Sequence, residues 1–436
     1  MIFSLLKKIL KQKIIHNIAL YSFFSAIQKC IPFLLYPLFA RIFTQEEVGY
    51  YMLYQAIYFL AIPIFTMSAE TSISINYFKL DKIEFAKYLT TVLSSITLYF
   101  ILLVFALYFV KDLLAKWIDF SSFWLVIAIL PILPRVIINV LLSLYRNLNI
   151  PNKYGILSVC SSFLNNIIGL VLIYTTSLSW EGIIIGVLVG DTIISIVCIW
   201  KLNKLNYFCF TFVREYVVDA FKISFPLSLH TVGCWLSNSL NRFFITTIIG
   251  VAATGSYGIG ATFSLILNLI IDSFNLAFGP YLYQRLREFT SEDRYEIVKI
   301  SCLFYLVIGL SAIIISLIGF WGVSLFFGME YESTKDFIIP LVLASALNGG
   351  YKVHVNSLFF SKKTYLITAV TFSMGILNIG LAYWMITYYG LLGAAYSSVC
   401  ITFCSYILIM FLANNLYPLH WWKNINLLIF NSIKND

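Results

Sequence analysis

Charged residues are scarce in this chain. Only 11% of its 436 residues are Asp, Glu, Lys or Arg, whereas 60% are hydrophobic. Soluble proteins carry roughly 25% charged residues, so a soluble globule of this length would lack the polar side chains that its surface requires. This shortage excludes a soluble enzyme and predicts a membrane protein.

Motifs for several kinds of chemistry are also missing. The chain has no G-x-x-x-x-G-K-[ST] nucleotide loop, no G-x-S-x-G serine motif and no H-E-x-x-H zinc motif. Its 8 cysteines form no C-x-x-C pair, and all but Cys209 lie inside apolar runs, which is typical of apolar packing residues. We therefore expect no metal, no cofactor, no disulfide framework and no catalytic residue.

Long apolar runs, by contrast, recur from one end of the chain to the other. A transmembrane helix needs about 20 apolar residues, whereas a membrane β-barrel would show alternating segments of about ten residues. The sequence therefore predicts an all-α polytopic membrane protein with about twelve transmembrane helices. The predicted spans lie near 17–40, 49–70, 88–110, 122–145, 155–176, 181–200, 223–248, 254–281, 297–320, 337–360, 364–388 and 391–414.

The basic residues indicate the orientation in the membrane. Of the 29 Lys and Arg residues, 21 fall in segments on the same side as the N-terminus, and only 4 fall on the opposite side. Because cytoplasmic loops are enriched in Lys and Arg, we predict that both termini are cytoplasmic. The same bias explains the net charge of +9 without a nucleic-acid partner.

An internal repeat predicts two halves. Two Gly-x-Tyr motifs, beginning at Gly49 and Gly255, align with each other, and an offset of 211 aligns a later Tyr–Gly–Gly pattern. Each half has six predicted spans that start on the same side, so the repeats are parallel and related by an axis along the membrane normal. We expect an N-terminal six-helix lobe over residues 1–206 and a C-terminal six-helix lobe over residues 207–436.

Charges inside the spans are candidates for function, because each one costs about 2.5–3.5 kcal/mol at a span centre. They are the bases Lys29, Arg135, Arg242 and Lys352 and the acids Asp191 and Asp272. Internal salt bridges are one interpretation, for instance between Asp272 and Lys29 or Arg242. Because four bases outnumber two acids, the other interpretation is an anionic ligand, and several Lys and Arg donors together suit a diphosphate.

Uncharged polar residues complete the candidate site. His230 and His354 are candidates for ion coupling together with the two acids, although each can instead form a structural hydrogen bond. The amides that we expect to line a wet cavity and accept sugar hydroxyls are Asn166, Asn238, Asn241 and Asn348. Interhelical hydrogen bonds are the alternative role for these amides.

Several short motifs carry a resemblance to a known family. They are Pro37-x-x-x-Arg41, then Glu46-Glu47-Val48-Gly49-Tyr50-Tyr51, then Asn241-Arg242-Phe243-Phe244-Ile245, and Ala277-Phe278-Gly279-Pro280. In these motifs, in length and in its two-lobed repeat, the chain resembles the Wzx-type flippases for O-antigen and other polysaccharide repeat units. These belong to the multidrug/oligosaccharidyl-lipid/polysaccharide exporter superfamily. Members commonly have Asp-Arg where this chain has Asn241-Arg242.

The resemblance implies an activity and partners. It implies that the protein flips undecaprenyl-diphosphate-linked oligosaccharide from the inner to the outer leaflet of the bacterial cytoplasmic membrane by alternating access. The implied partners are this lipid-linked substrate, membrane lipids and other polysaccharide assembly proteins. A basic, amide-lined cavity between the lobes would lower the barrier to moving a diphosphate and sugars through hydrocarbon.

Three alternatives stay open at this point. A multidrug antiporter of the same superfamily would favour cationic drugs and a cavity rich in carboxylates, whereas bases predominate here. A lipid II flippase is another relative, but it usually has fourteen spans. A membrane polysaccharide polymerase or ligase would need a large outer loop, and no predicted outer connection exceeds about twelve residues.

Overall fold

The computed structural model describes the backbone of residues 2–209 and 211–433, and the side chains of residues 20–209, 211–276 and 278–427. The basic N-terminal residues Lys7 to Lys13 lie outside the described side chains, and Lys434 lies outside the described backbone as well. Helices make up nearly all of the described part of the chain, and no strand occurs in it. The predicted all-α class is therefore confirmed.

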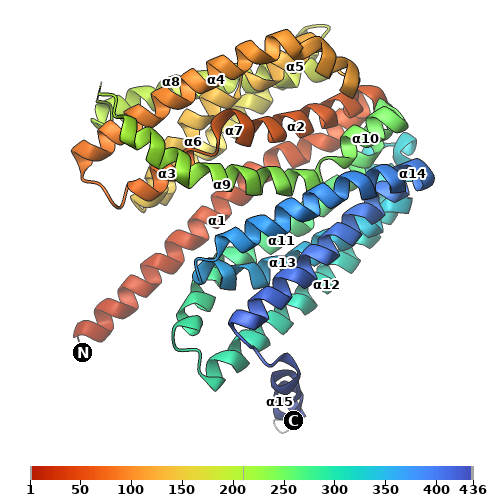
Figure 1. The fold of residues 1–436 in the computed structure, drawn as a ribbon. Helices are drawn as coiled ribbons and strands as arrows, with labels where there is room; N and C mark the ends of the chain where they lie inside the picture. Colours follow the sequence, from red (N-terminus) through yellow and green to blue (C-terminus); the bar gives the residue numbers. More distant parts are fainter. Residues whose placement is uncertain (1, 210, 434–436) are drawn as a thin grey trace. The chain divides into compact units, whose positions relative to one another are not determined.

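The chain divides into two units, of which the first comprises residues 1–235 and 249–255. In this unit α1 packs on α7, α7 on α8, and α6 against both α7 and α8. Its helices are α1 (Ile2–Ile42), α2 (Gln45–Thr66), α3 (Glu70–Asn76), α4 (Lys82–Ile118), α5 (Ser122–Ile129), α6 (Ile132–Asn147), α7 (Pro151–Thr175), α8 (Trp180–Lys204) and most of α9 (Arg214–Asn238) (Figure 1).

The second unit comprises residues 236–248 and 256–436. Within it, α13 lies along α14 and α12, and α10 packs on α14. Its elements are α10 (Asn241–Ile248), most of α11 (Val251–Glu288), α12 (Ser291–Phe327), the 3-10 helix η1 (Met329–Thr334), α13 (Lys335–Phe360), α14 (Thr364–Leu416) and α15 (Trp421–Ile433). The lobes predicted as 1–206 and 207–436 rest on the sequence repeat and stay a prediction.

Helices occupy every predicted span, with breaks that have local causes. The span near 122–145 is divided into α5 and α6, and Pro131, which lacks an N–H group, stands at the division. The last two predicted spans are two helices within α14 that meet at Gly390, where φ is +60° and the backbone is not helical. Nine helices in the described residues are long and apolar enough to cross a membrane.

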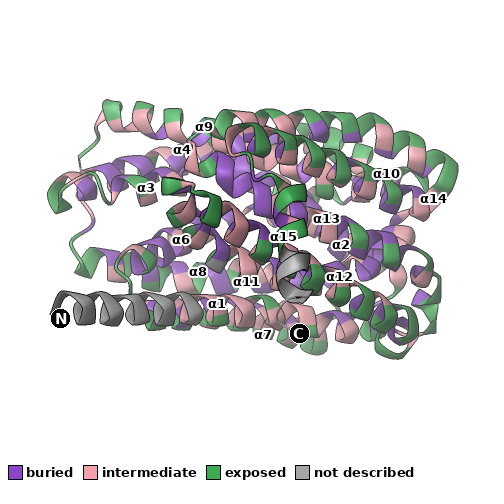
Figure 2. Cartoon of the chain, turned by 90° about the horizontal axis from the view of Figure 1, so that it is seen from below, coloured by how far each residue is buried: buried purple, intermediate pink, exposed green. Residues whose placement is uncertain are grey.

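Exposed apolar faces agree with a lipid environment. Figure 2 shows that buried residues gather where helices face one another, while exposed residues cover the outer faces. On α4 the exposed residues include Leu102 and Phe105, which are 57% and 63% exposed, and on α12 they include Leu310 and Ile313. Apolar faces of this extent are unfavourable in water, so the described helices form a multi-pass membrane protein.

Two glycines of the sequence repeat meet at one helix crossing in the first unit. A Cβ atom on Gly49 would lie 2.0 Å from the Val251 carbonyl oxygen, and one on Gly255 would lie 2.4 Å from the Gln45 carbonyl oxygen. Small residues let membrane helices approach this closely. The start of α11 therefore packs backbone to backbone against the start of α2.

The connection between α8 and α9 is held on the surface of α4. The Thr91 hydroxyl donates to the Thr211 carbonyl oxygen at 3.0 Å and accepts from the Val213 amide at 3.3 Å. The Tyr216 hydroxyl donates a hydrogen bond to the Glu84 carboxylate, and this bond raises the pKa of Tyr216 to about 12. These bonds explain why the first unit extends past the connection and includes most of α9.

Candidate functional site: ion pairs inside the helical units

The first ion pair lies among α6, α7 and α8. Nη2 of Arg135 on α6 lies 2.6 Å from Oδ1 of Asp191 on α8. The same oxygen accepts hydrogen bonds from the Asn165 amide at 2.8 Å and the Ser161 hydroxyl at 3.3 Å, both on α7. The Asp191 side chain is fully buried, whereas that of Arg135 is 21% exposed. The structure therefore joins two of the predicted site residues.

This cluster has spare hydrogen-bonding capacity. Oδ2 of Asp191 and Oδ1 of Asn165 are buried, and neither has a hydrogen-bond partner among the described residues. Buried polar atoms without partners are uncommon in native proteins and call for an explanation. Both are oxygen acceptors, so a transferred proton or another small donor would satisfy them.

The second ion pair lies in the second unit, between α11 and α13. Nζ of Lys352 is 2.5 Å from Oδ1 of Asp272, and the two side chains are 26% and 35% exposed. One helical turn further along α13, the Asn356 amide donates to the Asn275 side-chain oxygen at 2.7 Å. This pair is more accessible than the Arg135–Asp191 pair, and Asp272 takes a basic partner from α13.

Glycines in α13 allow the close packing around Lys352. A Cβ atom on Gly349 would lie 2.5 Å from Cδ1 of Ile308, and one on Gly350 would lie 2.9 Å from the Tyr406 ring. Asn356, which is buried, was not among the predicted amides. Its position four residues after Lys352, and so on the same helix face, is the signal that could have identified it.

The other two predicted bases lie outside these two ion pairs. The Lys29 side chain is exposed on α1, and Arg242, at the start of α10, is half-buried. The structure thus distributes the four bases over α1, α6, α10 and α13, and it links Arg135 and Lys352 to the two predicted acids.

The histidines differ in burial. His354 on α13 is only 3% exposed, and its Nε2 lies 3.1 Å from the Tyr305 hydroxyl. The rings of Tyr406 and Trp421 pack beside it. These surroundings are of the kind expected for a histidine that forms a structural hydrogen bond. His230 on α9 is half-buried, with Nε2 3.8 Å from Sγ of Cys234.

The predicted cavity amides have different surroundings. Asn241 is fully buried, and its amide donates to the Ala394 carbonyl oxygen at 2.8 Å and the Ser398 hydroxyl at 3.0 Å. The Asn166 amide donates to the Ser162 carbonyl oxygen of its own helix at 2.6 Å. Asn238 is exposed and Asn348 half-buried. Asn241 therefore ties α10 to α14 in the structure.

Two units of long apolar helices, each with an ion pair between its helices, define a polytopic membrane protein. Residues 14–286 match the family model described as polysaccharide biosynthesis protein. This match spans more than half of the chain, so the protein belongs to that family.

Individual proteins are also similar to this chain. A Haemophilus influenzae protein described as an uncharacterized membrane protein is 24% identical over 340 residues, which are 77% of this chain and 81% of that protein. The structure is similar to that of the lipid II flippase MurJ in an inward closed conformation, with a TM-score of 0.74, 16% identity, and coverage of 96% of this chain and 93% of that one. It is also similar to an inward-facing multidrug resistance MATE family transporter of the MOP superfamily, with a TM-score of 0.70, 17% identity, and coverage of 91% and 99%.

Proposed function

We propose that this protein is a flippase that moves an undecaprenyl-diphosphate-linked oligosaccharide, an O-antigen or related repeat unit, from the inner to the outer leaflet of the bacterial cytoplasmic membrane. The observation that carries the proposal is the match of residues 14–286 to the polysaccharide biosynthesis family. The similarity to a lipid II flippase supports it further, because a fold of this kind accommodates a lipid flippase.

The proposed mechanism is alternating access with the lipid tail kept in the bilayer. Moving a diphosphate and sugars through hydrocarbon is costly because their hydration is lost. The bases that we propose to lower this barrier are Lys29, Arg135, Arg242 and Lys352. We also propose that four amides form hydrogen bonds with sugar hydroxyls. They are Asn166, Asn238, Asn241 and Asn348.

The ion pairs favour an anionic substrate over a cationic drug. Asp191 is engaged by Arg135, and Asp272 is engaged by Lys352. A cationic drug would have to displace a built-in cation from either carboxylate, whereas a diphosphate can recruit the guanidinium or ammonium group itself. A multidrug antiporter is therefore the less favoured candidate.

We propose that ion coupling, where it occurs, uses Asp191, Asp272, His230 or His354. Oδ2 of Asp191 is buried without a hydrogen-bond partner among the described residues, so protonation there would add a donor where one is lacking. Protonation would also weaken the ion pair with Arg135 and release a cation toward substrate.

Complementation of a bacterial strain that lacks its O-antigen flippase tests the proposal. The native chain should restore surface polysaccharide, whereas Arg242→Ala and Lys29→Ala should reduce it by about tenfold or more, because a hydrogen bond to a charged group is worth about 1.5–3 kcal/mol. Polysaccharide is measured by gel staining and protein level by immunoblot of membranes.

Lys111→Ala is the matched control, since this base lies near the end of α4, where its ammonium group packs over the Tyr108 ring at 4.1 Å. It should transport normally. Normal transport by both Arg242→Ala and Lys29→Ala would refute the cationic cavity, and failure of the native chain to restore polysaccharide would refute the proposed function.

A further inference from the structure

A strained break lies at the end of the second predicted span. α2 ends at Thr66 and α3 begins at Glu70. Between them Met67 and Ser68 have φ values of +51° and +54°, a left-handed conformation that residues other than glycine rarely adopt. Backbone strain of this kind clusters at functional sites.

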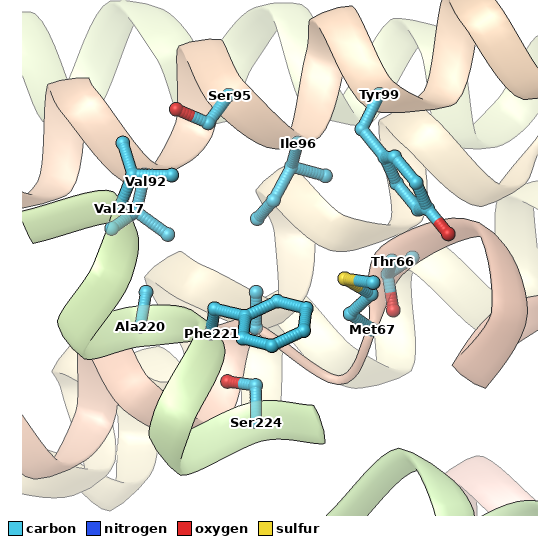
Figure 3. Close-up of a pocket in the computed structure, with 11 residues that line it drawn as sticks. Thr66, Met67, Val92, Ser95, Ile96, Tyr99, Val217, Ala220, Phe221 and Ser224 are labelled. Atoms are coloured by element: carbon cyan, nitrogen blue, oxygen red, sulfur yellow. The ribbon is translucent and has the colours of Figure 1, made fainter. Parts of the chain in front are cut away.

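An apolar cavity lies on one side of the break. It has a volume of about 350 Å³ and is bounded by Met67 at the break, by Ile96 and Tyr99 on α4, and by Ala220 and Phe221 on α9. Figure 3 shows these side chains around a common space. Tyr99 is 17 residues into α4, roughly 25 Å along the helix at ~1.5 Å per residue, so this cavity extends to the depth of the hydrocarbon.

A polar cavity borders the residues that follow the break. It has a volume of about 280 Å³, and its lining includes Glu70 and Ser74 on α3 and Asn139, Ser143 and Arg146 on α6. Oε2 of Glu70 and Oγ of Ser143 are buried, and neither has a hydrogen-bond partner among the described residues. The cavity thus contains polar atoms that a hydroxyl-rich ligand would satisfy.

Neighbouring residues of the chain border the two cavities. Met67 and Ala69 border the apolar cavity, and Glu70 and Thr71 border the polar one. Arg146 stands in the last turn of α6, next to a connection that is predicted to be cytoplasmic. An apolar cavity and a polar cavity are therefore bordered by consecutive residues, and the polar one includes a base near the predicted cytoplasmic side.

We infer that the break between α2 and α3 is a binding site for a polyprenyl-diphosphate-linked saccharide, with the first sugar and the phosphates in the polar cavity and the adjoining isoprene units in the apolar cavity. This inference rests on the proposed flippase function and names the residues that first hold the substrate. They differ from the intramembrane bases of the predicted cavity.

Each lining group has a chemical role in this site. The Arg146 guanidinium donates to phosphate oxygens, for which its planar donors are well suited. The Glu70 carboxylate and the Ser143 hydroxyl accept hydrogen bonds from sugar hydroxyls, because an ionised carboxylate is an acceptor only. Phe221, which is 47% exposed, covers the tail at the mouth of the apolar cavity.

Photocrosslinking in the full-length protein tests this assignment. p-Benzoylphenylalanine replaces Phe221, or, as the matched control, Phe105, an exposed phenylalanine of α4 that does not line the cavity. The probe is radiolabelled undecaprenyl-diphosphate-N-acetylglucosamine in nanodiscs of phosphatidylethanolamine and phosphatidylglycerol. Labelling at position 221 should exceed that at position 105 by about tenfold, and excess phospholipid should not compete with it.

Three further variants test the two cavities. Glu70→Gln should reduce labelling at position 221 by the sugar-linked probe but leave labelling by undecaprenyl diphosphate without sugar unchanged. Arg146→Gln should reduce labelling by both probes. Ser95→Leu, which fills the apolar cavity from α4 without touching the polar one, should reduce labelling by both probes as well.

The failure of this inference is distinguishable from failure of the proposed function. Equal labelling at positions 221 and 105, or competition by phospholipid, overturns the site. If the native chain then still restores surface polysaccharide in the flippase-deficient strain, the proposed function stands without it. If the native chain neither restores polysaccharide nor binds the probe, both fall.

Discussion

Asp191 is a carboxylate with no exposed surface, and its charge is tolerated because three side chains surround it. Arg135 supplies a countercharge at 2.6 Å, and Asn165 donates a hydrogen bond at 2.8 Å. Removing one partner of a buried ion pair leaves the other charge uncompensated, which costs about 3–5 kcal/mol, whereas replacing both with apolar residues is often neutral. The pair is therefore expected to respond to substitution as a unit.

Single and double substitutions of this pair should separate stability from transport. Asp191→Leu or Arg135→Met alone should lower the thermal unfolding midpoint strongly, by the equivalent of about 3–5 kcal/mol, and the double variant should recover most of the loss. Midpoints are measured by fluorescence-detected size exclusion in detergent. If Arg135 also serves the substrate, the double variant should be stable yet inactive in complementation.

An exposed pair provides the control for these variants. Lys87 and Glu84 on α4 are 2.8 Å apart and about one-third exposed, so substituting Lys87→Met should leave the midpoint unchanged within error. A double Asp191/Arg135 variant as unstable as either single variant would contradict the account of a mutually dependent pair.

Helices of the first unit meet where glycines repeat in the sequence. The aligned motifs at Gly49 and Gly255 indicate duplication, and the structure adds that these glycines share one crossing between α2 and α11. The backbone approach leaves no space for a methyl group at either position. Other glycines of the same helical type, such as Gly309 and Gly380, have no atom within 4 Å of an added Cβ.

Alanine substitutions should therefore have opposite effects at the two kinds of glycine. Gly49→Ala places Cβ against the Val251 carbonyl oxygen and should destabilise the protein by about 1–3 kcal/mol, as overpacking does. Gly309→Ala on α12 should leave stability unchanged or raise it by up to ~1 kcal/mol, because alanine favours the helix. Thermal midpoints of the purified variants decide this, and equal effects at the two sites would refute the close crossing.

The whole molecule combines apolar outer faces with an uneven distribution of basic residues. Apolar faces on α4 and α12 indicate that the helices lie in lipid, but they are the same whichever way the protein is inserted. The orientation is predicted by the 21 basic residues on one side against 4 on the other. It decides from which leaflet a lipid would enter the site at the α2–α3 break.

Labelling of single cysteines should establish the orientation. All 8 native cysteines are free and are first replaced; Ser333→Cys on η1 or Asn203→Cys at the end of α8 then adds one exposed thiol. A membrane-impermeant maleimide should label position 333 in intact cells and position 203 only after permeabilisation. Labelling of position 203 in intact cells would reverse the predicted topology.

Much of the architecture follows from the sequence alone because lipid imposes simple requirements on it. A span needs about 20 apolar residues with internally bonded backbone, so the apolar runs located the helices. The predicted gap between 388 and 391 contains Gly390, where the two helices of α14 meet. The division of the predicted span 122–145 into α5 and α6 is not among the predictions, although its local cause, Pro131, stands in the sequence. These are local properties, and each can be recognised from a few consecutive residues.

Which charged side chains pair with one another, by contrast, is decided by the tertiary structure. The sequence identified Lys29, Arg242 and Asp272 as possible partners, and the structure places Lys352 against Asp272. It also places Glu70, which is not among the predicted site residues, beside a polar cavity at a strained break. Which side chains meet depends on the rotation and depth of each helix relative to its neighbours, and these are set by packing between residues far apart in the chain.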